Sequence, residues 1–121
     1  MTDKEEYGLS PQKKTQTIEP PIVDYLPPTP KQYNPGIALI GTGGISEFHL
    51  KNYKSCGYRI VALANRNLNK AEEMRDKFYP NASVHQDYQE ILECDEVEVV
   101  DVTPHPNDRL PILYDCLNAG K

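Results

Sequence analysis

The stretch IALIGTGGIS, residues 37–46, decides the fold class that this sequence predicts. Its first four residues are apolar on both faces, which is typical of a strand buried in a parallel sheet. A glycine-rich turn follows at once, in which Gly41 allows a tight bend and Gly43 lets a diphosphate approach the backbone. Ser46 takes the third position, where a small residue lets helix and strand pack closely. Such a turn between a strand and a helix predicts a dinucleotide-binding site.

Strand patterns recur along the chain after the first one at 37–40. Apolar or alternating runs predict strands at 58–64, 82–85 and 97–103. Helical patterns separate these runs, and such alternation is the signature of a right-handed parallel sheet. We therefore predict an α/β fold, namely a Rossmann-like parallel sheet of about four strands with helices on both faces.

The expected helices have recognisable boundaries. Asn67 can cap the second helix, and Asp87 with Glu90 resembles a capping box that opens a short third one. The last helix is expected to begin near Asn107 or Asp108, so that Pro111 falls in its first turn and Gly120 follows its end. Helical spacing predicts the buried faces as follows: Ile45, Phe48, His49, Tyr53 and Cys56 on the first helix, Leu68, Ala71, Met74 or the stem of Arg75, and Phe78 on the second, and Leu110, Leu113, Tyr114 and Leu117 on the last.

The first 35 residues differ from the rest in composition. Seven of the 11 prolines lie there, and proline excludes both helix interiors and central strands. We expect a proline-rich extended arm at 1–35 and a dinucleotide-binding domain at 36–121. The arm is open to three interpretations: a disordered leader, a segment that wraps its own domain or a second subunit, or a ligand for a proline-recognition module.

The composition argues against several classes of partner. A net charge of -5, with a pI near 5.1, does not suit a nucleic-acid surface. No apolar run approaches the roughly 18 residues of a membrane span, and the N-terminus does not resemble a secretory signal. Cys56, Cys94 and Cys116 are an odd set far apart in sequence, which favours reduced thiols over a disulfide framework or a zinc site. We therefore expect a cytoplasmic protein with no nucleic-acid or membrane partner.

The end of the second expected strand bears on which dinucleotide binds. An acidic residue there would bond the ribose hydroxyls and disfavour a 2′-phosphate. This chain instead has Asn65 and Arg66, with Lys70 one helical turn further on. Because no carboxylate repels the phosphate and Arg66 can bond it, the sequence favours NADP(H), or dual use, over strict NAD(H).

The glycine turn has alternative interpretations. A P-loop is excluded because no Gly-Lys-Ser/Thr follows. A turn whose glycines serve packing alone, or a methyltransferase that binds adenosylmethionine, both remain open from the residues themselves.

Several motifs together resemble the N-terminal domain of the Gfo/Idh/MocA family, which includes glucose–fructose oxidoreductase and inositol dehydrogenase. They are IALIGTGGISEFHL, VALANRNLNKAEEM, DYQEIL, VEVVDVTPHPNDR and LNAGK, and they span residues 36–121. The resemblance implies that the main chain of Gly41, Thr42, Gly43, Gly44 and Ile45 holds the diphosphate. It also implies that Asn65 and Arg66 occupy the ribose-selecting position, and that Thr103 and Pro104 lie against the nicotinamide side.

The resemblance also bears on the histidines. His105 follows the Thr-Pro turn near the expected nicotinamide end, with a structural role equally open, and the segment at 106–109 appears one residue longer than in relatives. His49 matches a histidine common on the family's first helix, where we expect packing or capping rather than catalysis.

The family's activity is implied only for a longer protein. Relatives carry a catalytic Lys in a Glu-Lys-Pro-like motif after the next strand, and a later Asp and His in a second domain. None of these lies within 121 residues, and Lys121 is not the catalytic Lys. We therefore expect a truncated part of an NAD(P)-dependent oxidoreductase that acts on a sugar-like or polyol alcohol and is a homo-oligomer at full length. A non-enzymatic NAD(P)-binding sensor remains the alternative.

Overall fold

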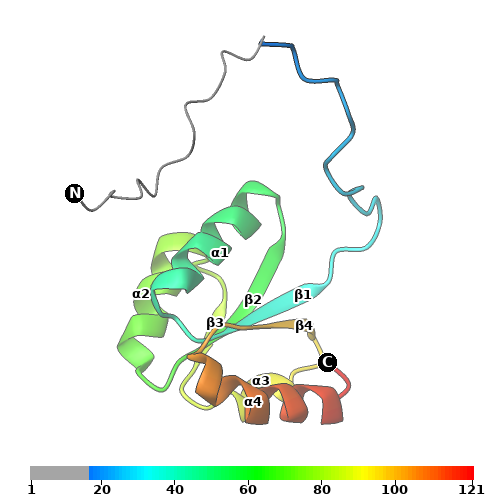
Figure 1. Cartoon of the computed structure of the whole chain (residues 1–121). Helices are drawn as coiled ribbons and strands as arrows, with labels where there is room; N and C mark the ends of the chain where they lie inside the picture. Colours follow the sequence, from blue (N-terminus) through cyan, green and yellow to red (C-terminus); the bar gives the residue numbers. More distant parts are fainter. Residues whose placement is uncertain (1–16) are drawn as a thin grey trace, which may run out of the picture.

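Four parallel strands form the centre of the fold in the computed structural model, which describes residues 17–121 (Figure 1). Each strand lies within one residue of its predicted bounds, and the sheet order is β3-β2-β1-β4. The strands are β1 (Gly36–Ile40), β2 (Arg59–Ala64), β3 (Ser83–His85) and β4 (Val97–Val102). This arrangement confirms the predicted Rossmann-like α/β fold.

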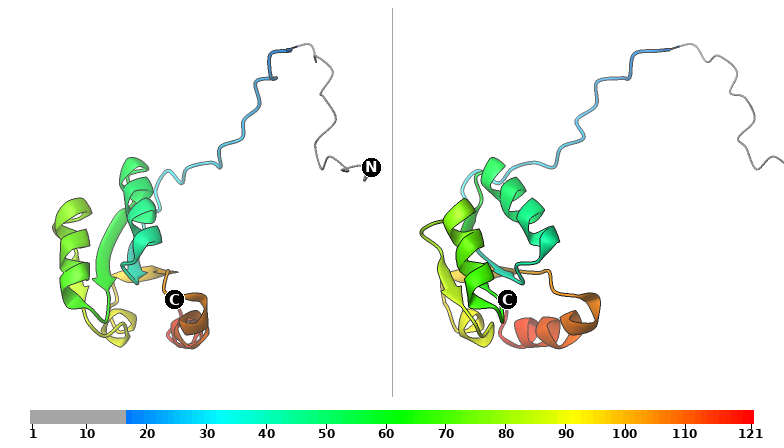
Figure 2. Two further views of the ribbon diagram at one scale, coloured as in Figure 1. Left: turned by 60° about the vertical axis from the view of Figure 1, so that its left-hand side comes forward. Right: turned by 90° about the vertical axis from the view of Figure 1, so that its left-hand side faces the viewer.

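The helices cover both faces of the sheet, as expected (Figure 2). They are α1 (Gly44–Ser55), α2 (Leu68–Phe78), α3 (Gln89–Leu92) and α4 (Pro106–Asn118). Leu50 of α1 and Met74 of α2 pack with Leu39 on one face. Ile91 of α3 and Ile112 of α4 pack on the other face with Ile40, which follows Leu39 in β1. Neighbouring β1 residues thus serve opposite cores, which explains why this strand is apolar throughout.

The carboxyl ends of three strands meet at one edge of the sheet. Ile40, the last residue of β1, pairs with Ala64 of β2 on one side and with Val102 of β4 on the other. The chain leaves β1 toward β2 through α1, whereas β3 returns across the sheet to β4 on the far side of β1. In open α/β sheets this change of direction creates a crevice where ligands bind.

Helix caps agree only partly with the prediction. The Asn67 side chain accepts a bond from the amide of Lys70 at 3.4 Å, so this predicted cap is confirmed. The capping box at Asp87 is not formed. Asp87 accepts a bond from the amide of Gln89, whereas the carboxylate of Glu90 pairs with His85 on β3.

The buried face predicted for α1 is only partly correct, because Tyr53 packs against the core but the predicted residues at the start of the helix do not. Ile45 and Phe48 are 52% and 65% exposed, whereas Ser46 and Leu50 are fully buried. The glycine turn brings the start of the helix against the sheet at its small third position. Close packing at Ser46, rather than the apolar stripe, therefore sets the rotation of the helix.

The last helix also presents an unexpected face to the sheet. Ile112 and Cys116 are buried, and the helix begins at Pro106, so that Pro111 lies in its second turn rather than its first. Apolar residues occur on more than one side of this helix, and periodicity does not tell which side packs. The residues predicted to be buried are 43–69% exposed: Leu110, Leu113, Tyr114 and Leu117.

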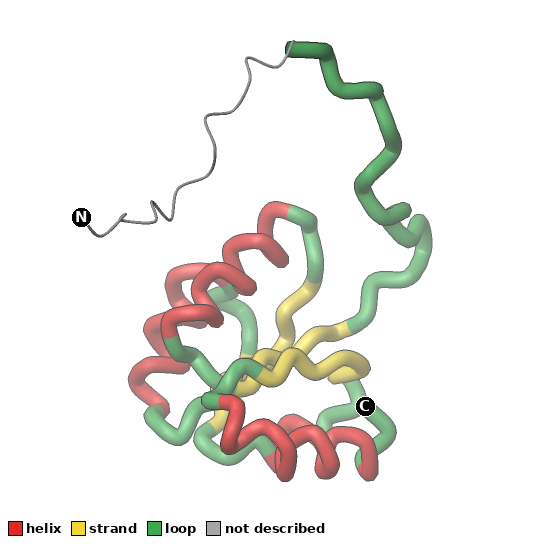
Figure 3. Tube along the Cα trace, viewed as in Figure 1, coloured by secondary structure: helices red, strands yellow, loops and turns green. Residues whose placement is uncertain are grey.

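The described part of the arm, residues 17–35, contains no helix or strand, as its prolines predict (Figure 3). It leads away from the sheet, and its side chains are almost all exposed. Only its end is tied down: the Tyr33 hydroxyl donates to Glu98 at 3.0 Å, and Arg59 donates to the carbonyl of Asn34. The expectations for residues 1–16 lie outside the described part. Between residues 17 and 121, no helix combines the length and apolarity that a membrane crossing requires.

Candidate functional site

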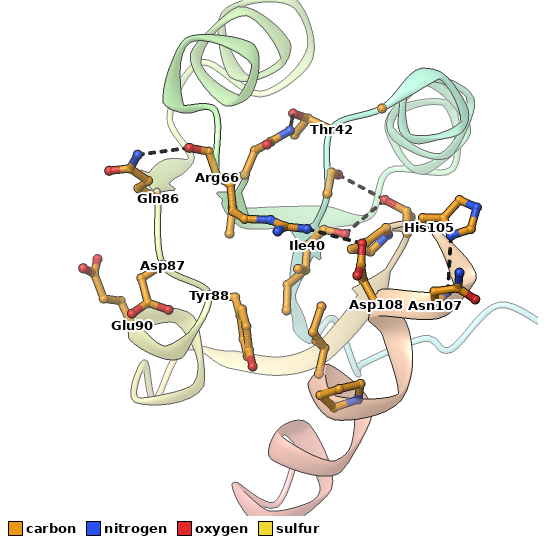
Figure 4. A pocket seen from close by; sticks show the side chains of 18 residues that line it. Ile40, Thr42, Arg66, Gln86, Asp87, Tyr88, Glu90, His105, Asn107 and Asp108 are labelled. Carbon is orange, nitrogen blue, oxygen red and sulfur yellow. Dashed lines mark hydrogen bonds and ion pairs between the residues drawn. The ribbon is translucent and has the colours of Figure 1, made fainter.

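A cleft of about 850 Å³ opens at the carboxyl edge of the sheet (Figure 4). Its volume lies in the range of about 300–1,000 Å³ that is usual for small-molecule sites. Three of the expected site residues, Gly44, Ile45 and Lys70, do not line it. The other expected residues all do: Gly41, Thr42, Gly43, Asn65, Arg66, Thr103, Pro104 and His105.

Gly41 makes the tight bend that the sequence predicts. Its φ is +93°, a conformation that side chains with a Cβ rarely adopt. A Cβ at this position would lie 2.8 Å from Oγ1 of Thr103, so the bend also depends on close approach to the end of β4. The amide of Gly41 donates to the carbonyl of Ala64 at 2.8 Å. Gly41 therefore shapes the turn, and its own amide is not available to a ligand.

The next four amides are available. Those of Thr42, Gly43, Gly44 and Ile45 form no hydrogen bond within the described residues. They lie at the N-terminus of α1, where unpaired amides and the helix dipole favour an anion. The run of unpaired amides ends at the following residue, Ser46, because its amide and hydroxyl both donate to the carbonyl of Gly43. The turn thus presents consecutive donors at a strand-to-helix junction.

The end of β2 is fastened to the glycine turn. The side-chain amide of Asn65 donates to Oγ1 of Thr42, and its oxygen accepts from the amide of Asn67 at 2.8 Å. Asn65 therefore braces the turn against the start of α2. Arg66 is far more open, with a side chain that is 86% exposed and lies 3.3 Å from the carboxylate of Asp108.

The end of β4 forms the third wall. The amide of Thr103 donates to the carbonyl of Ile40 at 2.9 Å, and its hydroxyl lies within bonding distance of the carbonyls of Ile40 and Gly41. Arg109 donates through Nε to the carbonyl of Pro104 at 2.6 Å. Both bonds hold the Thr-Pro turn against the glycine turn.

His105 caps α4. Its Nδ1 accepts from the amide of Asn107 at 3.3 Å, which is the side-chain cap of this helix. The geometry supports the structural role that the sequence left open for this residue.

Sequence reasoning missed part of the lining. Gln86, Asp87, Tyr88 and Glu90 enter the cleft from the segment after β3, and Asp108 enters from the first turn of α4. The rule that ligands lie at the carboxyl ends of parallel strands could have found the β3 group. Nothing local marks Asp108, because its partner Arg66 lies 42 residues earlier in the chain.

A second polar cluster joins α1 to β4 outside the cleft. One carboxylate oxygen of Asp101 lies 2.7 Å from Nδ1 of His49 and accepts the hydroxyl of Tyr53 at 2.8 Å. Asp101 is only 16% exposed, so both partners help to satisfy a largely buried charge. This geometry supports the expected packing role of His49.

The stability of the Tyr53→Phe variant is expected to depend less on pH in alkali than that of the native chain. Burial, and then the hydrogen bond to Asp101, raise the pKa of Tyr53. As the pH rises past about 10, the unfolded chain loses this proton first, so the free energy of unfolding falls. The variant lacks this contribution. Its stability should therefore fall less steeply above pH ~10, although Tyr79 and Tyr88, whose pKa values are also raised, keep part of the slope.

Urea unfolding across the alkaline range measures this difference, and the exposed Tyr114→Phe variant is the control. Equal slopes for the native chain and Tyr53→Phe would contradict the prediction.

Lys121 has a structural contact. Its Nζ donates to the carbonyls of Cys94 and Val97 at 3.0 and 2.7 Å. Residue 121 is thereby tied to the start of β4.

Comparison with known proteins identifies the family. Residues 36–121 match the Gfo/Idh/MocA oxidoreductase family, described as having an NAD-binding Rossmann fold. Inositol 2-dehydrogenase of Gluconacetobacter diazotrophicus is 30% identical over 88 residues, which are 71% of this chain and 26% of that protein. Trans-1,2-dihydrobenzene-1,2-diol dehydrogenase of Mus musculus is 39% identical over 74 residues, which are 60% and 21% of the two chains. The chain thus spans about a quarter of the length of these curated relatives.

Solved structures share the fold. Myo-inositol dehydrogenase from Lactobacillus casei, in complex with NAD(H) and myo-inositol, matches with a TM-score of 0.67 and 22% identity over 71% of this chain and 26% of that one. A 3-ketoreductase from Actinomadura kijaniata, in complex with TDP-benzene and NADP, has a TM-score of 0.66 and 23% identity over 74% and 28%. Since the family match covers residues 36–121, this chain belongs to the Gfo/Idh/MocA oxidoreductases and carries their NAD-binding Rossmann domain.

Proposed function

We propose that the cleft binds NAD(P) with its diphosphate on the amides of residues 42–45, of which 42 and 43 line the cleft and 44 and 45 follow at the start of α1. The observation that carries the proposal is the run of four unpaired amides at the N-terminus of α1, directly after β1. Gly43 and Gly44 carry no Cβ, and the space that a Cβ would fill at either residue is open, with nothing within 4 Å. Gly41 shapes this turn without donating to the ligand.

The two ends of the cleft suit the two halves of the cofactor. Asn65 and Arg66, at the end of β2, would flank the adenosine ribose, and Thr103, Pro104 and His105, at the end of β4, would flank the nicotinamide side. Lys70 is not part of the proposal, because its side chain is exposed on α2 and does not line the cleft.

We further propose that NADP(H) is preferred to NAD(H). Neither Asn65 nor Arg66 carries a negative charge, and the exposed Arg66 guanidinium can turn toward a 2′-phosphate. Known relatives do not decide the matter, because the structural neighbours include complexes with NAD(H) and with NADP.

Titration of the chain with NADPH and NADH by calorimetry tests both proposals. Both ligands are expected to bind, and NADPH is expected to bind more tightly by up to about tenfold, roughly 1.4 kcal/mol. A tenfold preference for NADH would reverse the choice of cofactor. Failure of both ligands to bind would contradict the dinucleotide site itself.

In the whole protein, we propose that the domain serves hydride transfer to or from a sugar-like or polyol alcohol. The support is the similarity to inositol 2-dehydrogenase. The nicotinamide ring would accept or donate the hydride, whereas the residues of this chain hold the cofactor and fix the Thr-Pro turn beside it. The catalytic Lys, Asp and His of the family are not among residues 1–121. A sensor would lack that Lys in the whole protein, and the family match gives no support to a methyltransferase.

A further inference from the structure

An ion pair joins the two walls of the cleft. Arg66 lies just after β2 and Asp108 lies in the first turn of α4, yet their side chains meet at 3.3 Å. Figure 4 shows the Arg66 side chain extending across the cleft toward Asp108. Both residues line the cleft, so the pair lies within it rather than on an unrelated surface, and Arg66 is its member at the proposed adenosine end.

The backbones that carry this pair are both held in place. The carbonyl of Arg66 accepts from the side-chain amide of Gln86 at 3.0 Å, and the amide of Asp108 donates to the carbonyl of His105 at 2.8 Å. The carboxylate of Asp108 is also favoured by the N-terminal end of the helix dipole. The two side chains are 86% and 50% exposed, so they can separate without a change in the fold.

We propose that Asp108 is a specificity-determining residue that lowers the preference for NADP(H) by holding Arg66. This inference rests on the proposed function of the cleft. A 2′-phosphate needs the Arg66 guanidinium as a partner, so NADP(H) must break the ion pair before it gains that contact. NAD(H) has a hydroxyl at this position and leaves the pair intact. The carboxylate therefore lowers the affinity for NADP(H) and leaves the affinity for NAD(H) unchanged.

The exposure of the ion pair sets how much it weakens the binding of NADP(H). Ion pairs between solvent-exposed side chains alter an equilibrium constant by up to about fivefold. The native chain thus keeps a moderate preference for NADP(H) over NAD(H). An Arg66 without this partner would give a larger preference.

The test compares D108N, R66Q and the double variant with the native chain by calorimetric titration with NADPH and NADH at one ionic strength. D108N is expected to bind NADPH about fivefold more tightly and to bind NADH within about twofold of the native value. In the R66Q background, D108N is expected to change neither affinity, because the pair no longer exists. D76N is the matched control, since Asp76 pairs with Arg75 on α2 outside the cleft.

Different failures are distinguishable. Equal tightening of NADPH binding by D108N with and without Arg66 would overturn the inference, because the effect would then be a general charge effect. An unchanged NADPH-to-NADH ratio in D108N would overturn it as well, while leaving the dinucleotide site standing. Loss of both ligands by D108N, with thermal unfolding unchanged, would show instead that Asp108 shapes the cleft. A native chain that binds neither ligand contradicts the proposed function, and the inference is then rejected with it.

Discussion

The Gly41→Ala variant is expected to bind NADPH and NADH more than about tenfold more weakly and to lose about 2–4 kcal/mol of its free energy of unfolding. The φ of +93° is strained for alanine, and the added Cβ would meet Oγ1 of Thr103 at 2.8 Å and the nitrogen of Pro104 at 3.0 Å. Relief of that clash moves the glycine turn away from the Thr-Pro turn. Stability and binding should therefore fall together, which urea unfolding and calorimetric titration measure.

Gly43→Ala separates the two effects. Gly43 has an ordinary φ of −79°, and its added Cβ meets nothing within 4 Å. The variant should keep its stability within about 0.5 kcal/mol, as most exposed substitutions do, yet bind both dinucleotides more weakly because the methyl group stands beside the proposed diphosphate. If Gly43→Ala binds them as tightly as the native chain does, the diphosphate does not lie on this turn.

The parts of the fold that were predictable rest on short-range physics. The strand β1 is recognisable because both of its faces are buried, and the turn after it because Gly41 must adopt a positive φ. Asn67 is recognisable as a cap because its side chain needs only the amide three residues later. Each of these features depends on residues within a few positions of one another.

The rotation of the helices depends on contacts that no local pattern encodes. Phe48 and Leu117 extend apolar stripes, yet they are 65% and 69% exposed. The buried residues are instead Ser46 on α1, which is small, and Cys116 on α4, which lies one position from the expected stripe. Close approach between elements selected these residues, and spacing along the chain does not show which elements approach.

The candidate site divides in the same way. Arg66 and Thr103 were predictable because each follows the end of a parallel strand, where ligands bind in such sheets. Their partners were not predictable. The pairing of Arg66 with Asp108 spans 42 residues, and the contact between Thr103 and the carbonyl of Gly41 spans 62. Only the folded sheet brings these groups together.

The Ser46→Leu variant is expected to lose about 2–3 kcal/mol of its free energy of unfolding, because Ser46 has no exposed surface and extra methylene groups have no space to enter. Displacement of the first turn of α1 also moves the unpaired amides, so the affinity for NADPH and NADH should fall in parallel. Denaturant unfolding and ligand titration measure these two effects on the same sample.

Ser46→Ala is the matched control for that variant. It keeps the small volume and loses only the hydroxyl, which donates to the carbonyl of Gly43 at 2.5 Å. A lost hydrogen bond of this kind costs about 1 kcal/mol, and the amide of Ser46 still bonds the same carbonyl, so the turn should keep its shape and its ligands. If Ser46→Leu were as stable as Ser46→Ala, close packing at this position could not be what sets the rotation of α1. The orientation of the amides at the start of that helix would then need a different cause.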